Sequence, residues 1–434
     1  MASKHKLGRL ALSVLAATAV LASAACGSSS SSTGATSAAA DDSWNTKGPI
    51  NYVQGKDTSG NVAAIIKKWN DANPNEKVSL IELSESADEQ RAAMIKNAES
   101  KGGSNYDVLS VDVVWTAEFA ANQYLAEMPN VDTTGYLKAA VDSGTYFNKL
   151  YAFPSTSDGA MLYYRKDLLT AAGINAAPKT WDEMKAACAA VKAKGVTIDC
   201  YGGQFQKYEG LTCNFAEMVN SAGGEFLSAD GKPTVNTDKA VAGVKWAVDA
   251  FTDGTIPKAA LTWKEEESRK YFQDGKLLFL RQWPYVYSLA NKTDGSSAIA
   301  GKFGVAPIPG LTGPGVSTLG GHNMGISKFT KNKGTALAFI KWWNNAENQK
   351  ANTIATSNAP TWVALYTDPE LTSKFEYLPV LKASIDNAKA RPKAVKYGDV
   401  TLAIQDAAYS ALNGQAAPKA AMDALQTKLE GLVK

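Results

Sequence analysis

Histidine is almost absent from this sequence, which has two among its 434 residues, His5 and His322. A Ser-His-Asp or Cys-His mechanism would have to use His322, and no Gly-x-Ser-x-Gly elbow accompanies it. The sequence also lacks paired histidines for zinc and the glycine-rich signatures of nucleotide sites. It therefore predicts no catalytic residue, no metal site and no nucleotide cofactor.

Basic runs are missing as well. Residues 1–25 hold three cations and no acidic residue, so that without them 42 of the 45 Lys and Arg remain against 42 Asp and Glu. This balance argues against nucleic acid as a partner and against electrostatic binding to a membrane. After residue 25 no stretch approaches eighteen consecutive apolar residues, so we expect a water-soluble folded part.

The N-terminus carries an export pattern. Lys4, Lys6 and Arg9 precede an apolar stretch at 10–25 that ends in small residues. This pattern is typical of a signal peptide, predicted at 1–25, and not of a spanning helix. Residues 26–44 are predicted to be a flexible tether, because 27–40 contain almost only Ser, Gly, Ala and Thr.

Cys26 stands at the predicted cleavage site. The segment resembles a bacterial lipoprotein signal, in which this cysteine is acylated and anchors the chain. Ala25 and Gly27 fit that pattern, whereas Ser23 stands where the pattern has Leu. The alternative is ordinary cleavage after Ala25, which would release a soluble protein. We expect a chain held by lipid alone on the outer face of the cytoplasmic membrane.

Three cysteines follow Cys26, namely Cys188, Cys200 and Cys213. An oxidising exterior favours one disulfide and one buried thiol. Cys188–Cys200 is the preferred pair, because a helix followed by a returning strand would bring the two together. Cys200–Cys213 remains the alternative. The spacings differ from those of zinc-binding cysteines, and no histidine is near.

The order of predicted elements indicates an α/β fold. Strands are predicted at 50–53, 78–83, 106–112, 161–164, 276–281, 303–309 and 322–327. Helices are predicted at 61–70, 86–100, from 116, 180–194, 237–252, 263–273, 333–345, 370–388 and 402–432. Ser86/Glu89 and Thr180/Glu183 have the spacing of capping boxes. About 390 ordered residues exceed one core, so two lobes are expected.

Aromatic residues lie beside polar ones where predicted strands end. Sugar rings have apolar faces and hydroxyl rims, so a sugar site needs flat aromatic rings together with carboxylates or Arg. Most of the ten Trp and seventeen Tyr are expected in the core. Trp115 and Trp283 follow strands, however, and ligands of open α/β sheets bind beyond the carboxyl ends of strands.

Six ordered motifs carry a family resemblance over nearly the whole chain after the signal. They lie at 107–120, 151–169, 206–211, 283–285, 319–327 and 390–392. With them the sequence resembles the extracellular solute-binding proteins of carbohydrate ABC importers, and in particular the trehalose/maltose-binding group. The resemblance implies a two-lobed, periplasmic-binding-protein-like fold of type II with the ligand cleft between the lobes. It places lobe 1 at 45–157 and 306–357, lobe 2 at 158–305 and 358–434, and the hinge near 153–158 and 305–309.

The resemblance also implies the roles of site residues. Asp112 and Asp158 would accept sugar hydroxyls, Trp283 would stack, and Arg391 would give a forked contact. The remaining expected ligand-binding residues are Asp57, Trp115, Tyr208, Glu209, Tyr285, Gly320, Gly321 and His322. The backbone N–H groups of Gly320 and Gly321 would act as donors.

Structural roles compete with several of these. Asp158 could cap the segment after it, Arg391 could pair with Asp399 or Glu209, and the two glycines could serve only a backbone turn. His322 stands where relatives commonly have Trp, and Lys56 adds a charge that a neutral disaccharide does not need. A longer, amino-bearing or acidic saccharide therefore stays open beside trehalose and maltose.

The predicted function is capture of a disaccharide or short oligosaccharide by a monomer that closes around it. The closed form would deliver the sugar to the permease subunits of an ABC importer, whose energy comes from a separate ATPase. A secreted glycoside hydrolase with paired carboxylates is one alternative. A glycan-sensing surface protein is the other.

Overall fold

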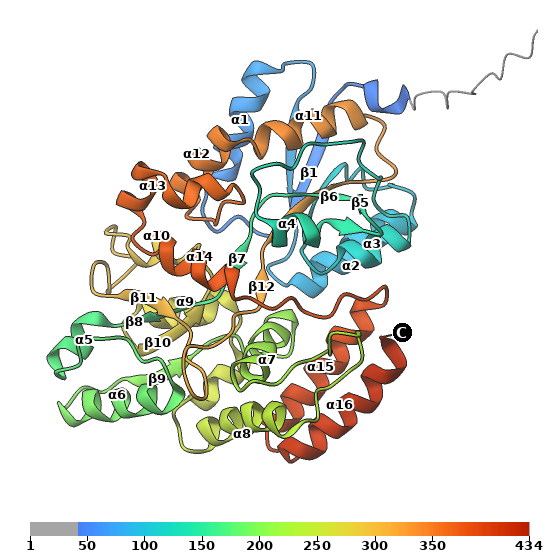
Figure 1. Ribbon diagram of the computed structural model, residues 1–434. Coiled ribbons are helices and arrows are strands. Elements are labelled where there is room, and N and C mark those ends of the chain that lie inside the picture. Colours follow the sequence, from blue (N-terminus) through green and yellow to red (C-terminus); the bar gives the residue numbers. More distant parts are fainter. Residues whose placement is uncertain (1–41, 434) are drawn as a thin grey trace, which may run out of the picture. The chain divides into compact units, whose positions relative to one another are not determined.

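The computed structural model describes residues 42–433 (Figure 1). The predicted signal peptide, Cys26 and the tether up to residue 41 lie outside the described residues. The predicted tether ends too late in the sequence, because residues 42–44 already belong to the 3₁₀ helix η1 (Asp42–Asn45). Trp44 packs there against the apolar core, which holds this end of the segment in place.

A five-stranded sheet has the strand order β2-β1-β3-β13-β6. Its strands are β1 (Ile50–Gln54), β2 (Val78–Glu82), β3 (Val108–Asp112), β6 (Ala152–Pro154) and β13 (His322–Ile326). The strands β1, β2 and β3 are parallel, whereas β13 runs antiparallel to β3 and β6. Helices beside this sheet are α1 (Val62–Ala72), α2 (Ala87–Glu99), α3 (Thr116–Ala121), α4 (Lys138–Ser143), α11 (Lys333–Trp343) and α12 (Ala346–Thr356) (Figure 1).

A four-stranded sheet has the order β11-β8-β10-β9. Its strands are β8 (Met161–Tyr164), β9 (Asp199–Gly202), β10 (Leu277–Gln282) and β11 (Gly304–Pro307). The remaining helices are α5 (Lys166–Ala171), α6 (Trp181–Ala193), α7 (Glu209–Ser221), α8 (Asp238–Thr252), α9 (Glu265–Gln273), α10 (Val286–Ala290), α13 (Pro369–Lys374), α14 (Leu378–Asp386), α15 (Tyr397–Leu412) and α16 (Pro418–Leu432), with 3₁₀ helices η2 (Lys258–Thr262) and η3 (Val363–Thr367).

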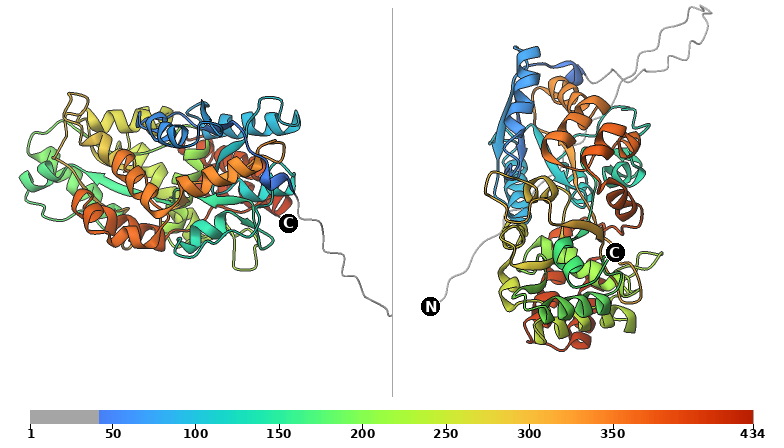
Figure 2. Two further views of the ribbon diagram at one scale, coloured as in Figure 1. Left: turned by 90° about the horizontal axis from the view of Figure 1, so that it is seen from above. Right: turned by 90° about the vertical axis from the view of Figure 1, so that its left-hand side faces the viewer.

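The two sheets have separate cores, as expected for two lobes. The amphipathic helix α1 buries Val62, Ile65, Ile66 and Trp69 on one face, at helical spacing, in the core of the five-stranded sheet. A different apolar cluster joins β9 and β10 to α6, α7, α8, α15 and α16. In the second view of Figure 2 the blue N-terminal elements lie in the upper half, and the green and yellow-green helices α6, α7 and α8 lie in the lower half.

Two short strands connect the sheets. β7 (Asp158–Gly159) follows β6 and leads into β8, while β12 (Leu319–Gly320) leads into β13. They pair with each other, with Gly320 opposite Asp158. Ala306 and Pro307 pair with β8, so the chain returns to the five-stranded sheet at His322 and not at the predicted residue 306. The rest of the predicted lobe division stays a prediction.

Local predictions succeed where sequence signals are complete. Thr180 and Glu183 form both hydrogen bonds of a capping box at the start of α6. Ser86 precedes α2 as predicted, but its side chain makes no capping bond. The two helices predicted at 370–388 and 402–432 are each broken in two, with Pro379 in the first turn of α14 and Pro418 in that of α16. Proline lacks the N–H that a continuous helix needs. A short hairpin, β4 (Thr145–Tyr146) and β5 (Lys149–Leu150), was not predicted.

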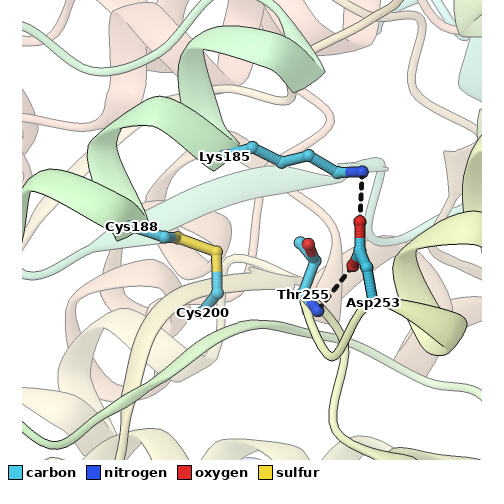
Figure 3. The surroundings of a disulfide bond; sticks show 5 residues. All are labelled: Lys185, Cys188, Cys200, Asp253 and Thr255. Carbon is cyan, nitrogen blue, oxygen red and sulfur yellow. Dashed lines mark hydrogen bonds and ion pairs between the residues drawn. A yellow bond between two sulfur atoms is a disulfide. The ribbon is translucent and has the colours of Figure 1, made fainter. Parts of the chain in front are cut away.

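The preferred disulfide is present and joins Cys188 on α6 to Cys200 on β9, with Cα atoms 5.5 Å apart (Figure 3). Beside it Lys185 on α6 pairs with Asp253 at 2.8 Å. Cys213 is a buried free thiol. Among the helices described, none combines the length and apolarity needed to cross a bilayer.

Candidate ligand-binding cleft

A cavity of about 340 Å³ lies between the two sheets, beyond the carboxyl ends of β1, β3 and β10. This volume falls within the range of roughly 300–1,000 Å³ that small-molecule sites occupy. Eleven of the twelve predicted ligand-binding residues line it. They are Asp57, Asp112, Asp158, Tyr208, Glu209, Trp283, Tyr285, Gly320, Gly321, His322 and Arg391.

Arg391 joins carboxylates from the two halves of the protein. Its Nη2 donates to Asp112 Oδ1 at 2.7 Å, and Asp112 ends β3 of the five-stranded sheet. Its Nη1 donates to Glu209 Oε1 at 2.5 Å, and Glu209 begins α7 in the other half. Arg391 is 3% exposed, and its forked contact goes to these two carboxylates. The structural role considered for Arg391, an ion pair with Glu209, is therefore present. Among residues 42–433 no ion pair joins Arg391 to Asp399.

Glu209 is held by further donors. Tyr397 and Thr401, both on α15, donate their hydroxyls to its carboxylate, Thr401 at 2.7 Å. Burial raises the pKa of Glu209, and the positive charge of Arg391 opposes that shift. Its carboxylate is therefore fixed in place before any ligand arrives.

Asp158 contrasts with Glu209, because no side-chain hydrogen bond or ion pair to its carboxylate is found within residues 42–433. Asp158 lies on β7, opposite Gly320, and lines the cavity. Burial raises the pKa of Asp158 to about 7, the negative charge of Asp112 adds to the shift, and Arg281 opposes it. A carboxylate that lacks protein donors and borders a cavity suits a ligand that supplies hydroxyl donors.

Trp283 presents an aromatic ring to the cavity just after β10. The guanidinium of Arg281 lies 3.8 Å from the centre of this ring. Glu217 and Gln204 hold Arg281 by hydrogen bonds of 2.7 and 2.8 Å, so the support behind the ring is rigid. Gly320 lies against the ring edge, where an added Cβ would come within 3.0 Å of it. The indole is thus fixed by its neighbours, as stacking on a flat ligand requires.

Two tyrosines of the site are tied to acids at the start of α9. The Tyr208 hydroxyl donates to Glu265 at 2.6 Å, and the Tyr285 hydroxyl donates to Glu266 at 2.7 Å. Burial raises the pKa of Glu265. Both acids line the cavity and were not predicted. The signal that could have found them is the run of three acids, 265–267, in the first turn of a helix.

The glycine pair occupies a crowded turn between β12 and β13. Gly321 has φ +106°, and a Cβ there would lie 2.3 Å from the carbonyl oxygen of Thr156. His322 follows, and its backbone N–H donates to the Thr156 hydroxyl at 2.9 Å. Burial lowers the pKa of the His322 ring, which favours its neutral form. The backbone turn therefore requires Gly321, and the donor role of the pair stays a prediction.

Asp57 reaches the cavity wall, but its carboxylate already accepts hydrogen bonds from its own chain. Oδ1 accepts from the N–H and hydroxyl of Ser59, and Oδ2 accepts from the N–H of Val62 at the start of α1. The Lys56 side chain is 55% exposed and lies 3.9 Å from Glu82. Both residues therefore have structural explanations in addition to their position at the cavity.

Trp115 is the exception among the predicted ligand-binding residues, since it does not line the cavity. It is 1% exposed and stacks on Phe119 at 6.0 Å. The tight turn after β3, in which the Trp115 N–H donates to the Asp112 carbonyl, carries the indole into the core beside α2 and α3. The prediction of a ligand contact at Trp115 is therefore corrected.

Helix α12 supplies polar wall residues that were not predicted. Gln349, Asn352, Thr353 and Thr356 follow one face of it at helical spacing and line the cavity. Gln349 donates to Thr361 at 2.7 Å and accepts from its N–H, so its amide is already fixed. A polar stripe at spacing i, i+3, i+4 and i+7 was the available signal. Within the part of the chain described, no group of His, Cys, Asp and Glu could hold a metal ion.

Comparison with known proteins agrees with this arrangement. Residues 64–379 match the family described as bacterial extracellular solute-binding protein. A relative from Deinococcus radiodurans, named a probable ABC transporter-binding protein, is 34% identical over 367 residues, which cover 81% of this chain and 86% of the relative.

Solved structures share the fold. Maltose-bound MalE3 of T. maritima is 31% identical, with a TM-score of 0.83, over 88% of this chain and 99% of that one. The GacH receptor of Streptomyces glaucescens, solved unliganded and with acarbose, is 24% identical with a TM-score of 0.79 over 89% and 98% of the two chains, a likeness of fold alone. These neighbours confirm the two-lobed α/β fold of type II. Since the family match and the Deinococcus relative each span most of the chain, the protein belongs to the bacterial extracellular solute-binding proteins and is a binding protein, not an enzyme.

Proposed function

We propose that this chain is the carbohydrate-binding component of an ABC importer. It would capture a disaccharide or short oligosaccharide, with an α-glucoside such as maltose or trehalose as the preferred ligand. The observation that carries the proposal is the pairing of a supported indole, Trp283, with a carboxylate that lacks protein donors, Asp158, in one cavity. Sugars offer the matching apolar face and hydroxyl donors.

The known relatives support the choice of ligand class. MalE3, the structure described above at 31% identity, was solved with maltose. A relative from Bacillus subtilis that is 22% identical is named a galactooligosaccharide-binding protein. The identity to MalE3 makes maltose a reasonable first ligand, while His322 and Lys56 at the cavity leave room for a different saccharide.

In the proposed mechanism the lobes open and close about the two connecting strands β7 and β12. Asp112 of the five-stranded half and Trp283 of the four-stranded half both line the cavity, so a sugar bound there would bridge both lobes and favour the closed form by its differential affinity. The closed monomer would dock on permease subunits that work with a separate ATPase. A lipid on Cys26 would hold it at the outer face of the cytoplasmic membrane.

A thermal-shift screen tests the proposal. Maltose, trehalose, maltotriose and sucrose would be compared with mannitol and with the amino acids leucine and glutamate. One saccharide should raise the melting temperature strongly, since a ligand at a thousand times its Kd adds about 4 kcal/mol. The same incubations should release no monosaccharide. A shift by leucine or glutamate alone would contradict the ligand class, and sugar release would favour the glycoside hydrolase.

A further inference from the structure

The N-terminus of α7 lacks a cap from its own segment. Tyr208 precedes the helix, and its side chain makes no capping bond; its hydroxyl donates to Glu265. The first backbone N–H groups of a helix have no partner within the helix and require one elsewhere. The N–H of Glu209, the first residue of α7, must therefore be satisfied from outside the segment.

Its acceptor comes from the other half of the protein. Asp88 lies in the first turn of α2, which packs on β3, and its Oδ2 accepts the Glu209 N–H at 2.8 Å. Its Oδ1 also accepts from Gln405 of α15 at 3.5 Å. Both hydrogen bonds of this carboxylate thus go to the helices of the four-stranded half. Asp88 itself does not line the cavity.

This contact lies directly beside the Arg391 bridge, because Glu209 takes part in both. Asp88 holds its backbone, and Arg391 ties its carboxylate to Asp112. An acidic group at a helix N-terminus is also favoured by the helix dipole. We propose that Asp88 is a positioning residue that caps α7 across the cleft, so that lobe closure itself is stabilised without ligand and Glu209 is aligned for the site.

The inference rests on the closure proposed above but not on the identity of the sugar, so its primary test uses ligand-free protein. Hydrogen exchange of the first turn of α7, residues 209–212, and the radius of gyration from small-angle scattering would be measured. In Asp88→Ala we expect exchange there to be roughly fivefold faster, the effect of losing an N-cap of about 1 kcal/mol. The radius of gyration should increase, because the open form gains population.

Two further variants separate this role from a general effect on α2. Asp88→Asn keeps an acceptor oxygen but loses the charge, so its exchange should lie between that of Asp88→Ala and the wild type. Glu89→Ala removes the neighbouring, exposed acid of the same turn and should leave both readouts unchanged. If Asp88→Ala does not fold, Asp88→Ser replaces it, since the short hydroxyl cannot span the cleft.

With maltose as the probe, Asp88→Ala should bind about fivefold more weakly than wild type. The inference would be overturned if a folded Asp88→Ala variant had the same hydrogen exchange, radius of gyration and maltose affinity as the wild type. It would also be overturned if Glu89→Ala changed these readouts as much as Asp88→Ala does. If maltose fails to bind the wild type, the proposed ligand is wrong, and the two ligand-free readouts still decide the role of Asp88.

Discussion

At the scale of single residues, Trp283 gives the most direct prediction. Its ring borders the cavity and is supported by Arg281. Trp283→Ala should weaken sugar binding at least about thirtyfold, equivalent to roughly 2 kcal/mol for a buried aromatic anchor. Titration calorimetry would measure this loss. Trp246→Phe serves as the control, because Trp246 stacks on Trp181 outside the cavity, and equal affinities of the two variants would contradict the stacking role.

Asp158 gives a prediction of pH dependence. Its pKa is about 7 in the folded protein against 3.8 for the free carboxyl, so the folded state keeps the proton over a wider pH range. The proton on Asp158 therefore stabilises the folded state fully below about pH 4, and this contribution to the free energy of unfolding is lost as pH rises through about 7. Asp158→Asn stays neutral, so its stability should improve relative to wild type between pH 5 and pH 8.

We expect this relative gain to be about 1–2 kcal/mol, because the carboxylate borders the cavity and keeps part of its hydration. Urea unfolding of the ligand-free proteins at both pH values measures it. Asp142→Asn, which changes an exposed acid paired with Lys138 away from the cavity, provides the control. A constant difference between Asp158→Asn and wild type from pH 5 to pH 8 would contradict the argument.

The sequence was informative at this scale where a residue follows a strand. Asp112 and Trp283 reach the cavity because strand ends of both sheets meet there. Trp115 follows a strand too, but the turn after β3 directs it inward, and sequence does not reveal that direction. The bridge from Arg391 to Asp112 joins residues far apart in the chain, so only the folded structure reveals it.

At the scale of elements, the turn between β12 and β13 should tolerate no side chain at Gly321. A Cβ would meet the Thr156 carbonyl oxygen at 2.3 Å, and φ is +106°. Gly321→Ala should lower the free energy of unfolding by about 3 kcal/mol or more. Gly231→Ala, at φ +80° with open space around it, should cost only about 1 kcal/mol. Urea denaturation compares the two, and equal costs would contradict the role of crowding.

The disulfide between α6 and β9 should act on stability alone. Replacing Cys188 and Cys200 by Ser should remove about 2–3 kcal/mol, because their crosslink closes a short loop. Neither cysteine lines the cavity, so sugar affinity should stay unchanged. Thermal unfolding and calorimetric titration of the double variant would check both parts. A large loss of affinity with unchanged stability would contradict this assignment.

Element boundaries were predictable where a local signal was complete. The capping box at Thr180 gave the start of α6 correctly. The breaks before α14 and α16 were missed because a predominantly helical pattern continues on both sides, although Pro379 and Pro418 are visible in the sequence. Helix α7 was missed because residues 206–211 were recognised only as a motif of the family, and its cap comes from α2 through a tertiary contact.

At the scale of the whole molecule, the charges gathered at the cleft join the two halves. Arg391 is buried between Asp112 and Glu209. Asp88, on α2 of the five-stranded half, accepts the backbone N–H of Glu209 at the start of α7. Such buried pairs cost desolvation and specify one arrangement when all partners are in place. The length of the chain indicated two lobes, but the charged residues that connect them are far apart in sequence and are brought together only by the fold.

Titration calorimetry with the saccharide that raises the melting temperature most tests the central claim directly. We predict one binding site per chain, no turnover, and loss of binding in a Trp283→Ala/Asp158→Ala double variant that remains folded. The matched Trp246→Phe/Asp142→Asn variant should bind like the wild type. Full binding by the double cavity variant would contradict the account, since the sugar would then lie elsewhere.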